Sequence, residues 1–353
     1  MNDNRDYSLD VIKILATIII VFHHYQQTIG GHFKFIDFYG GKFYFGYIVE
    51  LFFLLSGYFM YRYIDKIKNG LNFKKFFKKR YLRFFPLVAL TSIVYSVLLY
   101  IYTNVLHLKW FGYKVSLWGT IISSLCISEG FGLSNPCINY PNWYISVLLI
   151  CFIVFYILVQ ISIKNKIPIN YLFIIMIIIG FGIRTYNIKL PFMTPNVARG
   201  YYSFFFGLLL YDILMKYKIN RFIKIISLLF VILIPILIHY DIPIFKDVNY
   251  LMTFLYYPAL IIIFKYTRIN KLFKKSFIST ISEVTFDVYL WHNVLLLFMC
   301  LLIKAFKITI NLASLKIMIC FTIASFIVGF VSYYVFEKPI KNRILMYITI
   351  KYR

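Results

Sequence analysis

Apolar runs long enough to cross a membrane recur along the whole chain. A helix that crosses the hydrocarbon core of a bilayer needs about 20 mostly apolar residues, and its backbone groups must bond within the helix. Only 14% of the 353 residues are charged, whereas a soluble domain carries about a quarter. We therefore predict an all-α polytopic membrane protein, a single domain over residues 1–353 with about ten transmembrane helices. The predicted spans are 8–28, 43–63, 84–103, 143–163, 171–187, 200–215, 222–240, 249–266, 283–303 and 312–336.

Basic residues are distributed unevenly between the predicted loops. The chain has 38 Lys and Arg residues against 13 Asp and Glu residues, a net charge of +25. With a cytoplasmic N-terminus, 26 of the 38 fall in cytoplasmic segments and nine in outer segments, as the positive-inside rule expects. Basic loops beside apolar runs are typical of a cytoplasmic face and not of a nucleic-acid surface. We therefore predict two cytoplasmic termini, a location in the cytoplasmic (inner) cell membrane, and no nucleic-acid partner.

The longest predicted outer segment, residues 104–142, differs from the other loops. Residues 115–127 are apolar but too short to span a bilayer, so we expect a re-entrant or interfacial helix there. The stretch that follows is rich in Gly, Pro, Asn and Ser, which predicts irregular backbone facing water or a cavity. Cys126 and Cys137 both lie in this segment, and the sequence leaves open whether they form a disulfide.

A few ionisable side chains fall inside the predicted spans. Such residues are costly in lipid, so each is a candidate for a functional site that faces the protein interior. The helical rise places Lys13 near the cytoplasmic surface and His24 roughly 16 Å deeper, at the depth of Glu50 in the second span. His292 lies near the middle of the ninth span. An imidazole and a carboxylate at one depth suggest a general base and its orienting partner.

Each of these residues also has a structural explanation. A histidine such as His292 can simply donate a hydrogen bond to a carbonyl of a neighbouring helix, and Glu50 can be a buried contact between two helices. His23 and His24 are adjacent and point about 100° apart, so they cannot both face one cavity. The sequence alone leaves the structural and the functional explanation open.

The segment after the second span is strongly basic. It reads NFKKFFKKRYLRFFP over residues 72–86, with aromatic and basic residues at helical spacing. One explanation is an amphipathic helix that lies on anionic lipid. The other is a polyanion-binding site, because Arg80 and Arg83 lie three residues apart on one helical face and guanidinium groups suit phosphate oxygens. The sequence has neither a glycine-rich phosphate loop nor metal-ligand spacing, so we expect no metal and no tightly bound cofactor.

Several of these segments together resemble a known family. LDVIKILATIIIVFHH at 9–24 is similar to the first span of the integral membrane acyltransferase family 3, in which a basic residue precedes a histidine by ten intervening residues. Lys13 stands at the basic position, which is usually Arg, and His24 stands at the histidine position. Some relatives carry an extracellular hydrolase-like domain, and we expect this chain to be the stand-alone form. The other similar segments are VELFFLLSGYFM at 49–60, RYLRFFP at 80–86, NWYISVLLICF at 142–152, FDVYLWHNVLLL at 286–297 and FEKPI at 336–340.

The resemblance implies an activity and a set of site residues. Members of this family O-acylate surface sugars, which implies a cytoplasmic acyl-CoA co-substrate and a hydroxyl of a polysaccharide or lipid-linked glycan as the acceptor. Acetyl is the expected acyl group, and succinyl stays open. The sequence indicates no oligomeric state. The expected roles are His24 as general base with Glu50 as its orienting partner, Lys13, Arg80 and Arg83 as donor-binding residues, and Ser56, Trp143, His292 and Glu337 as residues that line the site.

A second class of function fits the buried ionisable residues equally well. A proton-coupled transporter, or a flippase for lipids or glycans, also needs His and Glu side chains within the membrane. The ordered set of motifs favours the acyltransferase over this alternative.

Overall fold

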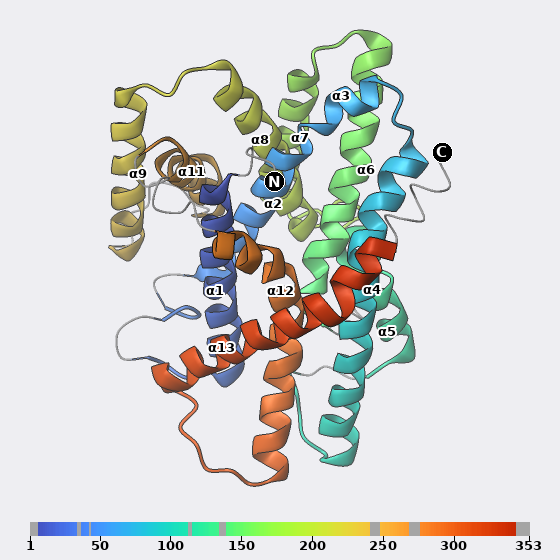
Figure 1. The fold of residues 1–353 in the computed structure, drawn as a ribbon, viewed down its shortest axis with the longest axis vertical. Coiled ribbons are helices and arrows are strands. Elements are labelled where there is room, and N and C mark those ends of the chain that lie inside the picture. The colour runs from blue at the N-terminus through green and yellow to red at the C-terminus, as the bar shows by residue number, and fades with distance from the viewer. Residues whose placement is uncertain are drawn as a thin grey trace.

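The computed structural model describes residues 6–33, 37–41, 44–111, 115–133, 139–240, 248–267 and 276–343, and most of these residues are helical (Figure 1). Within these ranges, the strand-like structure amounts to an isolated bridge between Leu190 and Met193. The prediction of an all-α protein is therefore confirmed. The helices are α1 (Tyr7–Ile29), α2 (Ile48–Met60), α3 (Tyr63–Lys68), α4 (Phe73–Tyr100), α5 (Leu117–Ser124), α6 (Asn142–Asn165), α7 (Ile169–Thr185), α8 (Pro195–Lys216), α9 (Arg221–His239), α10 (Val248–Leu251), α11 (Tyr257–Tyr266), α12 (Ser276–Ala305) and α13 (Leu315–Ser332).

Most of the long helices have the length and composition of membrane spans. In the described ranges, seven helical segments are long and apolar enough to cross a bilayer, and the helices at 45–60 and 169–185 are apolar but shorter. Each of the ten predicted spans contains a helix. The chain is thus a polytopic membrane protein, whereas the number of crossings and the cytoplasmic position of the termini stay predictions.

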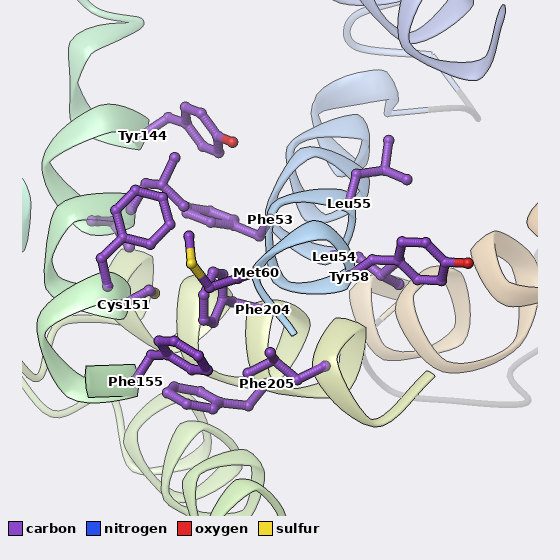
Figure 2. Close-up of a cluster of buried hydrophobic side chains, with 14 of the residues drawn as sticks. Phe53, Leu54, Leu55, Tyr58, Met60, Tyr144, Cys151, Phe155, Phe204 and Phe205 are labelled. Carbon is purple, nitrogen blue, oxygen red and sulfur yellow. The ribbon is translucent and has the colours of Figure 1, made fainter. Parts of the chain in front are cut away.

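Close packing joins α2 to α8. The two backbones approach one another at Gly57 and Gly207, where a Cβ on Gly57 would lie 1.9 Å from the carbonyl oxygen of Phe204. Around this contact, fully buried aromatic side chains such as Phe53 on α2 and Phe155 on α6 fill the space between the helices (Figure 2). Small residues at a helix crossing permit dense van der Waals contact, which drives helix association in lipid. The packing holds α2 in place, and α2 carries two of the predicted site residues.

The basic segment at 72–86 is not a separate interfacial helix. It is the first half of α4, which starts after Asn72, whose side chain accepts a hydrogen bond from the Lys75 amide at 2.8 Å. The helix continues through Pro86, although a proline removes one backbone hydrogen bond and usually bends a helix. Arg80 points inward from this helix and is only 8% exposed. Of the two explanations left open for this segment, a helix that lies on lipid therefore does not fit Arg80.

The segment 104–142, which is predicted to lie on the outer side, contains a short helix where its apolar stretch predicts one. This helix is α5, which packs against α4. Leu117 and Trp118 at its start are 78% and 63% exposed, as suits side chains at a membrane interface. Cys137 lies outside the described residues, so its pairing with Cys126 stays a prediction.

The approach of α2 to α8 predicts that Gly57 tolerates no side chain. We expect Gly57→Ala to lower the free energy of unfolding by about 1–3 kcal/mol, because the added methyl group forces two backbones apart. The measurement is thermal unfolding of the purified protein in detergent. Gly182→Ala on α7 is the matched control, since a Cβ there meets nothing within 4 Å. Equal melting temperatures for the two variants would contradict the close approach.

Candidate functional site

A cavity of about 620 Å³ lies where α1 and α4 begin and α2 ends. Its walls come from these helices, from α6 and α12, and from η6 (Tyr333–Glu337), a π-helical turn that follows α13. Its volume is within the usual range of small-molecule sites, about 300–1,000 Å³. The wall residues include the predicted site residues Lys13, Ser56, Arg80, Arg83 and Glu337. The tertiary structure thus brings five predicted residues from four elements around one space.

Arg80 is buried in the cavity wall. Its guanidinium lies 3.9 Å above the Tyr63 ring and 4.9 Å from the Phe76 ring. In the part of the chain that the structure describes, no carboxylate forms an ion pair with Arg80. Because a buried cation is costly without a compensating anion, this side chain is a candidate for binding an anionic ligand.

Lys13 and Arg83 contribute to the same cavity in different ways. The Lys13 ammonium lies 3.2 Å from the Asp10 carboxylate, which also accepts a hydrogen bond from the Ser282 hydroxyl at 2.7 Å. Arg83 follows Arg80 by three residues on α4 and is exposed. The three cations predicted to bind a polyanion therefore line the same cavity. Arg80 is buried, Lys13 is partly exposed and Arg83 is exposed.

His24 and His292 form a buried pair deeper in the bundle. The Nδ1 atom of His24 lies 2.7 Å from the Nε2 atom of His292, and the two rings stack 5.0 Å apart. His292 is fully buried, whereas His24 is 8% exposed. The histidine that the family motif singles out therefore has a second histidine as its direct partner, from a helix 268 residues away in sequence.

The hydrogen bonds of this pair define its tautomers. The Nδ1 atom of His292 lies 3.2 Å from the carbonyl oxygen of Val288, which can only accept. In the neutral form, His292 therefore carries its proton on Nδ1, and its Nε2 accepts. It follows that His24 donates from Nδ1 and keeps an unprotonated Nε2. That nitrogen is the basic atom of the pair.

An aromatic residue, Tyr289, connects the cavity wall to the histidine pair. Phe52 and Tyr144 line the cavity, and their rings lie 5.9 and 5.7 Å from the Tyr289 ring. The Tyr289 ring also lies 5.9 Å from that of His292. The Tyr144 hydroxyl is 3.2 Å from the hydroxyl of Ser56. The cavity wall and the histidine pair are thus neighbours that both contact Tyr289.

Glu50 does not orient His24. Its two carboxylate oxygens accept hydrogen bonds from the Arg199 guanidinium at 2.6 and 2.8 Å, and Tyr202 donates a third at 3.2 Å. Glu50 is fully buried, so this ion pair joins α2 to α8 inside the protein. The position beside His24 belongs to His292. The expectation of a Glu50–His24 pair is wrong because a nearer cation occupies the carboxylate.

Arg199 is the residue that the sequence argument missed. It was expected in an outer segment, but α8 begins at Pro195 and carries Arg199 into the protein interior. Its guanidinium lies 5.1 Å from the ring of Trp143, so Trp143 supports this ion pair and is not part of the cavity wall. The signal was present in the sequence, since Thr194 followed by Pro195 is typical of an N-cap and a first helical position.

This architecture defines a class of protein, a polytopic helical bundle with an internal cationic cavity next to a buried histidine pair. The family model described as Acyltransferase domain, acyltransferase 3, matches residues 6–337. The chain therefore belongs to this family and is a multi-pass membrane acyltransferase. No curated protein and no solved structure matches the chain.

The buried ion pair predicts a structural effect of Glu50. We expect Glu50→Gln to lower the free energy of unfolding by about 3–5 kcal/mol, because it leaves the Arg199 charge without a compensating anion. Thermal unfolding in detergent measures the effect. Lys216→Met is the control, because the Lys216 side chain is 58% exposed and its pair with Asp212 should contribute about 1 kcal/mol or less. A Glu50→Gln protein of normal stability that has lost only its activity would contradict this role.

Proposed function

We propose that this protein transfers an acetyl group from cytoplasmic acetyl-CoA to a hydroxyl of a cell-surface polysaccharide or lipid-linked glycan. The reaction takes place within the cell membrane. The observation that carries the proposal is the buried guanidinium of Arg80 in the wall of a cavity that also holds Lys13 and Arg83. Family membership supplies the acyl transfer, and the charge of the cavity suits a polyanionic donor.

The shape and charge of the cavity support CoA as the donor. The nucleotide end of CoA carries several phosphate charges, which suit the cations at the beginnings of α1 and α4. Its pantetheine arm is long, thin and only mildly polar, which suits the apolar wall formed by residues such as Leu148 and Phe152. The thioester then points toward Ser56 and Tyr144. It lies there beside the ring of Tyr289, which is also near the ring of His292.

His24 is the general base in this proposal. Its Nε2 accepts the proton of the acceptor hydroxyl while the hydroxyl oxygen attacks the thioester carbonyl. The new C–O ester bond forms, the C–S bond breaks, and CoA leaves as a thiolate. The thiolate takes up the proton that His24 accepted, which gives the free thiol and returns His24 to its neutral form. The hydrogen bond from Nδ1 of His24 to His292 holds the ring in the required tautomer and stabilises its positive charge. His292 is therefore the positioning residue, the role first expected of Glu50.

The first test of this mechanism is removal of the base. We expect His24→Ala to lower the turnover number by about a hundred- to ten-thousandfold, because general base catalysis typically contributes that much. The assay follows transfer of labelled acetyl from acetyl-CoA to the envelope glycan of the producing cell, in membranes with matched protein content. The same assay on His292→Ala should give a smaller loss, and His239→Ala, which changes a histidine at the exposed end of α9, should stay near the unchanged protein. Near-normal turnover of His24→Ala would remove His24 from the mechanism.

A second test separates donor binding from chemistry. We expect Arg80→Ala to raise the KM for acetyl-CoA by about ten- to a hundredfold with a smaller effect on the turnover number, because it removes hydrogen bonds to charged groups. Lys164→Ala is the matched control, since Lys164 is a cation on α6 that does not line this cavity. A change in the turnover number alone would contradict the assignment of Arg80 to the donor.

A further inference from the structure

Two buried carboxyl groups remain unexplained by this mechanism. Asp287 lies on α12 and is fully buried. One of its oxygens, Oδ1, accepts a hydrogen bond from the Ser332 hydroxyl at 2.7 Å. The indole of Trp291 donates to the same hydroxyl at 2.9 Å, which orients it. Among the described residues, the other oxygen, Oδ2, is buried without a hydrogen-bond partner.

Glu337 is the neighbour of Asp287. It ends the π-helical turn η6 and lines the proposed donor cavity. π-Helical turns inside longer helices shift the direction of side chains and are frequent at functional sites. The carboxyl groups of Glu337 and Asp287 lie within hydrogen-bonding reach of each other. Oε2 of Glu337 is likewise a buried oxygen with no partner in the described part of the chain.

The two orphaned oxygens require a hydrogen between them. Two carboxylates have no hydrogen to share, and a low-dielectric interior strongly disfavours a second negative charge so close to the first. The described residues place no Lys or Arg in an ion pair with either group. A single shared proton satisfies both oxygens and removes one of the two negative charges.

We propose that Asp287 and Glu337 form a proton-binding site, and that the proton held there maintains the affinity of the adjacent cavity for a polyanion. The second part rests on the proposed function of the cavity as a CoA site. With the proton bound, the pair carries one negative charge. When the proton is lost, the pair carries two negative charges, and the cavity attracts phosphate groups less strongly.

The cavity also has charged groups that do not belong to the Asp287–Glu337 pair. Glu283, on α12 with Asp287, accepts a hydrogen bond from the hydroxyl of Tyr333 at 2.8 Å, so that carboxylate is already bonded. Asp10 on α1 is paired with Lys13. The remaining charged groups on the wall are the cations Lys79, Arg80, Arg83 and Lys341. The Asp287–Glu337 pair differs from all of these groups, because two neighbouring carboxyl groups compete there for one proton.

The test uses Asp287→Asn in the full-length protein purified in detergent. An asparagine keeps the acceptor for Ser332 and can donate a hydrogen to Glu337, so it imitates the protonated pair but cannot titrate. The probe is CoA, whose dissociation constant is measured by calorimetry from about pH 6 to about pH 9. Glu283→Gln is the matched control, because it removes a cavity charge from the same helix outside the pair. Glu337→Gln is the second variant, in case Asp287→Asn does not fold.

We expect the CoA affinity of the unchanged protein to fall as the pH rises. The fall should be about fivefold larger than for Asp287→Asn, because only the unchanged protein gains a negative charge at this pair. Glu283→Gln should keep the pH dependence of the unchanged protein. Without CoA, the melting temperature of the unchanged protein should fall on alkalinisation more than that of Asp287→Asn, since the proton stabilises the folded state while it is bound.

Two results overturn parts of this inference separately. Identical pH profiles of melting temperature for the unchanged protein and Asp287→Asn overturn the proton site. If CoA binds at no pH, the proposed donor is wrong and the link to polyanion binding falls with it. The melting profiles then still decide whether the pair holds a proton.

Discussion

A charged side chain inside an apolar bundle must have a partner, because neither lipid nor protein interior replaces the water that it loses. This constraint organises the described structure. Glu50 and Arg199 satisfy one another and join α2 to α8. Asp10 holds Lys13, and His24 bonds to His292. Arg80 is different. It is a buried cation in the cavity wall that lies beside aromatic rings and forms no ion pair with a described carboxylate. The same constraint that explains the structural pairs is the reason for our proposal that Arg80 binds a negative charge of the ligand.

The site is divided in a way that suits a reaction between a soluble donor and an acceptor from the membrane or beyond it. The cationic cavity lies among the beginnings of α1 and α4 and the end of α2, while the histidine pair lies farther along α1. The Tyr289 ring lies near that of Tyr144, which lines the cavity, and near that of His292. In our proposal the thioester approaches Tyr289 from the cavity, and the acceptor hydroxyl reaches both the thioester carbonyl and His24.

Local pattern predicted a large part of this structure, and its failures have a common cause. Apolar runs located the helices because their length is set by the bilayer, and the motif at Lys13 and His24 can be recognised because both residues lie on one helix. Depth in the membrane pairs Glu50 with His24, whereas its partner in the structure is Arg199, 149 residues away on α8. The predicted span begins at residue 200 and leaves Arg199 in a loop, whereas α8 begins at Pro195 and includes it. For residues 72–86 the sequence leaves open a helix on lipid and a polyanion-binding site. In the structure they form the first half of α4, and Arg80 packs inward among aromatic rings.

The sequence by itself determined the class of the protein, an all-α membrane protein of the acyltransferase family, because composition, run length and motif order are local properties of the chain. It also determined which ionisable residues needed an explanation, because their cost in lipid does not depend on their neighbours. Only the tertiary structure decided which of them meet. Contacts such as His24 with His292, Glu50 with Arg199, and Asp287 with Glu337 join different helices. Such pairings depend on the rotation and crossing of helices, which result from packing at close contacts such as Gly57 on Phe204 and not from any single segment.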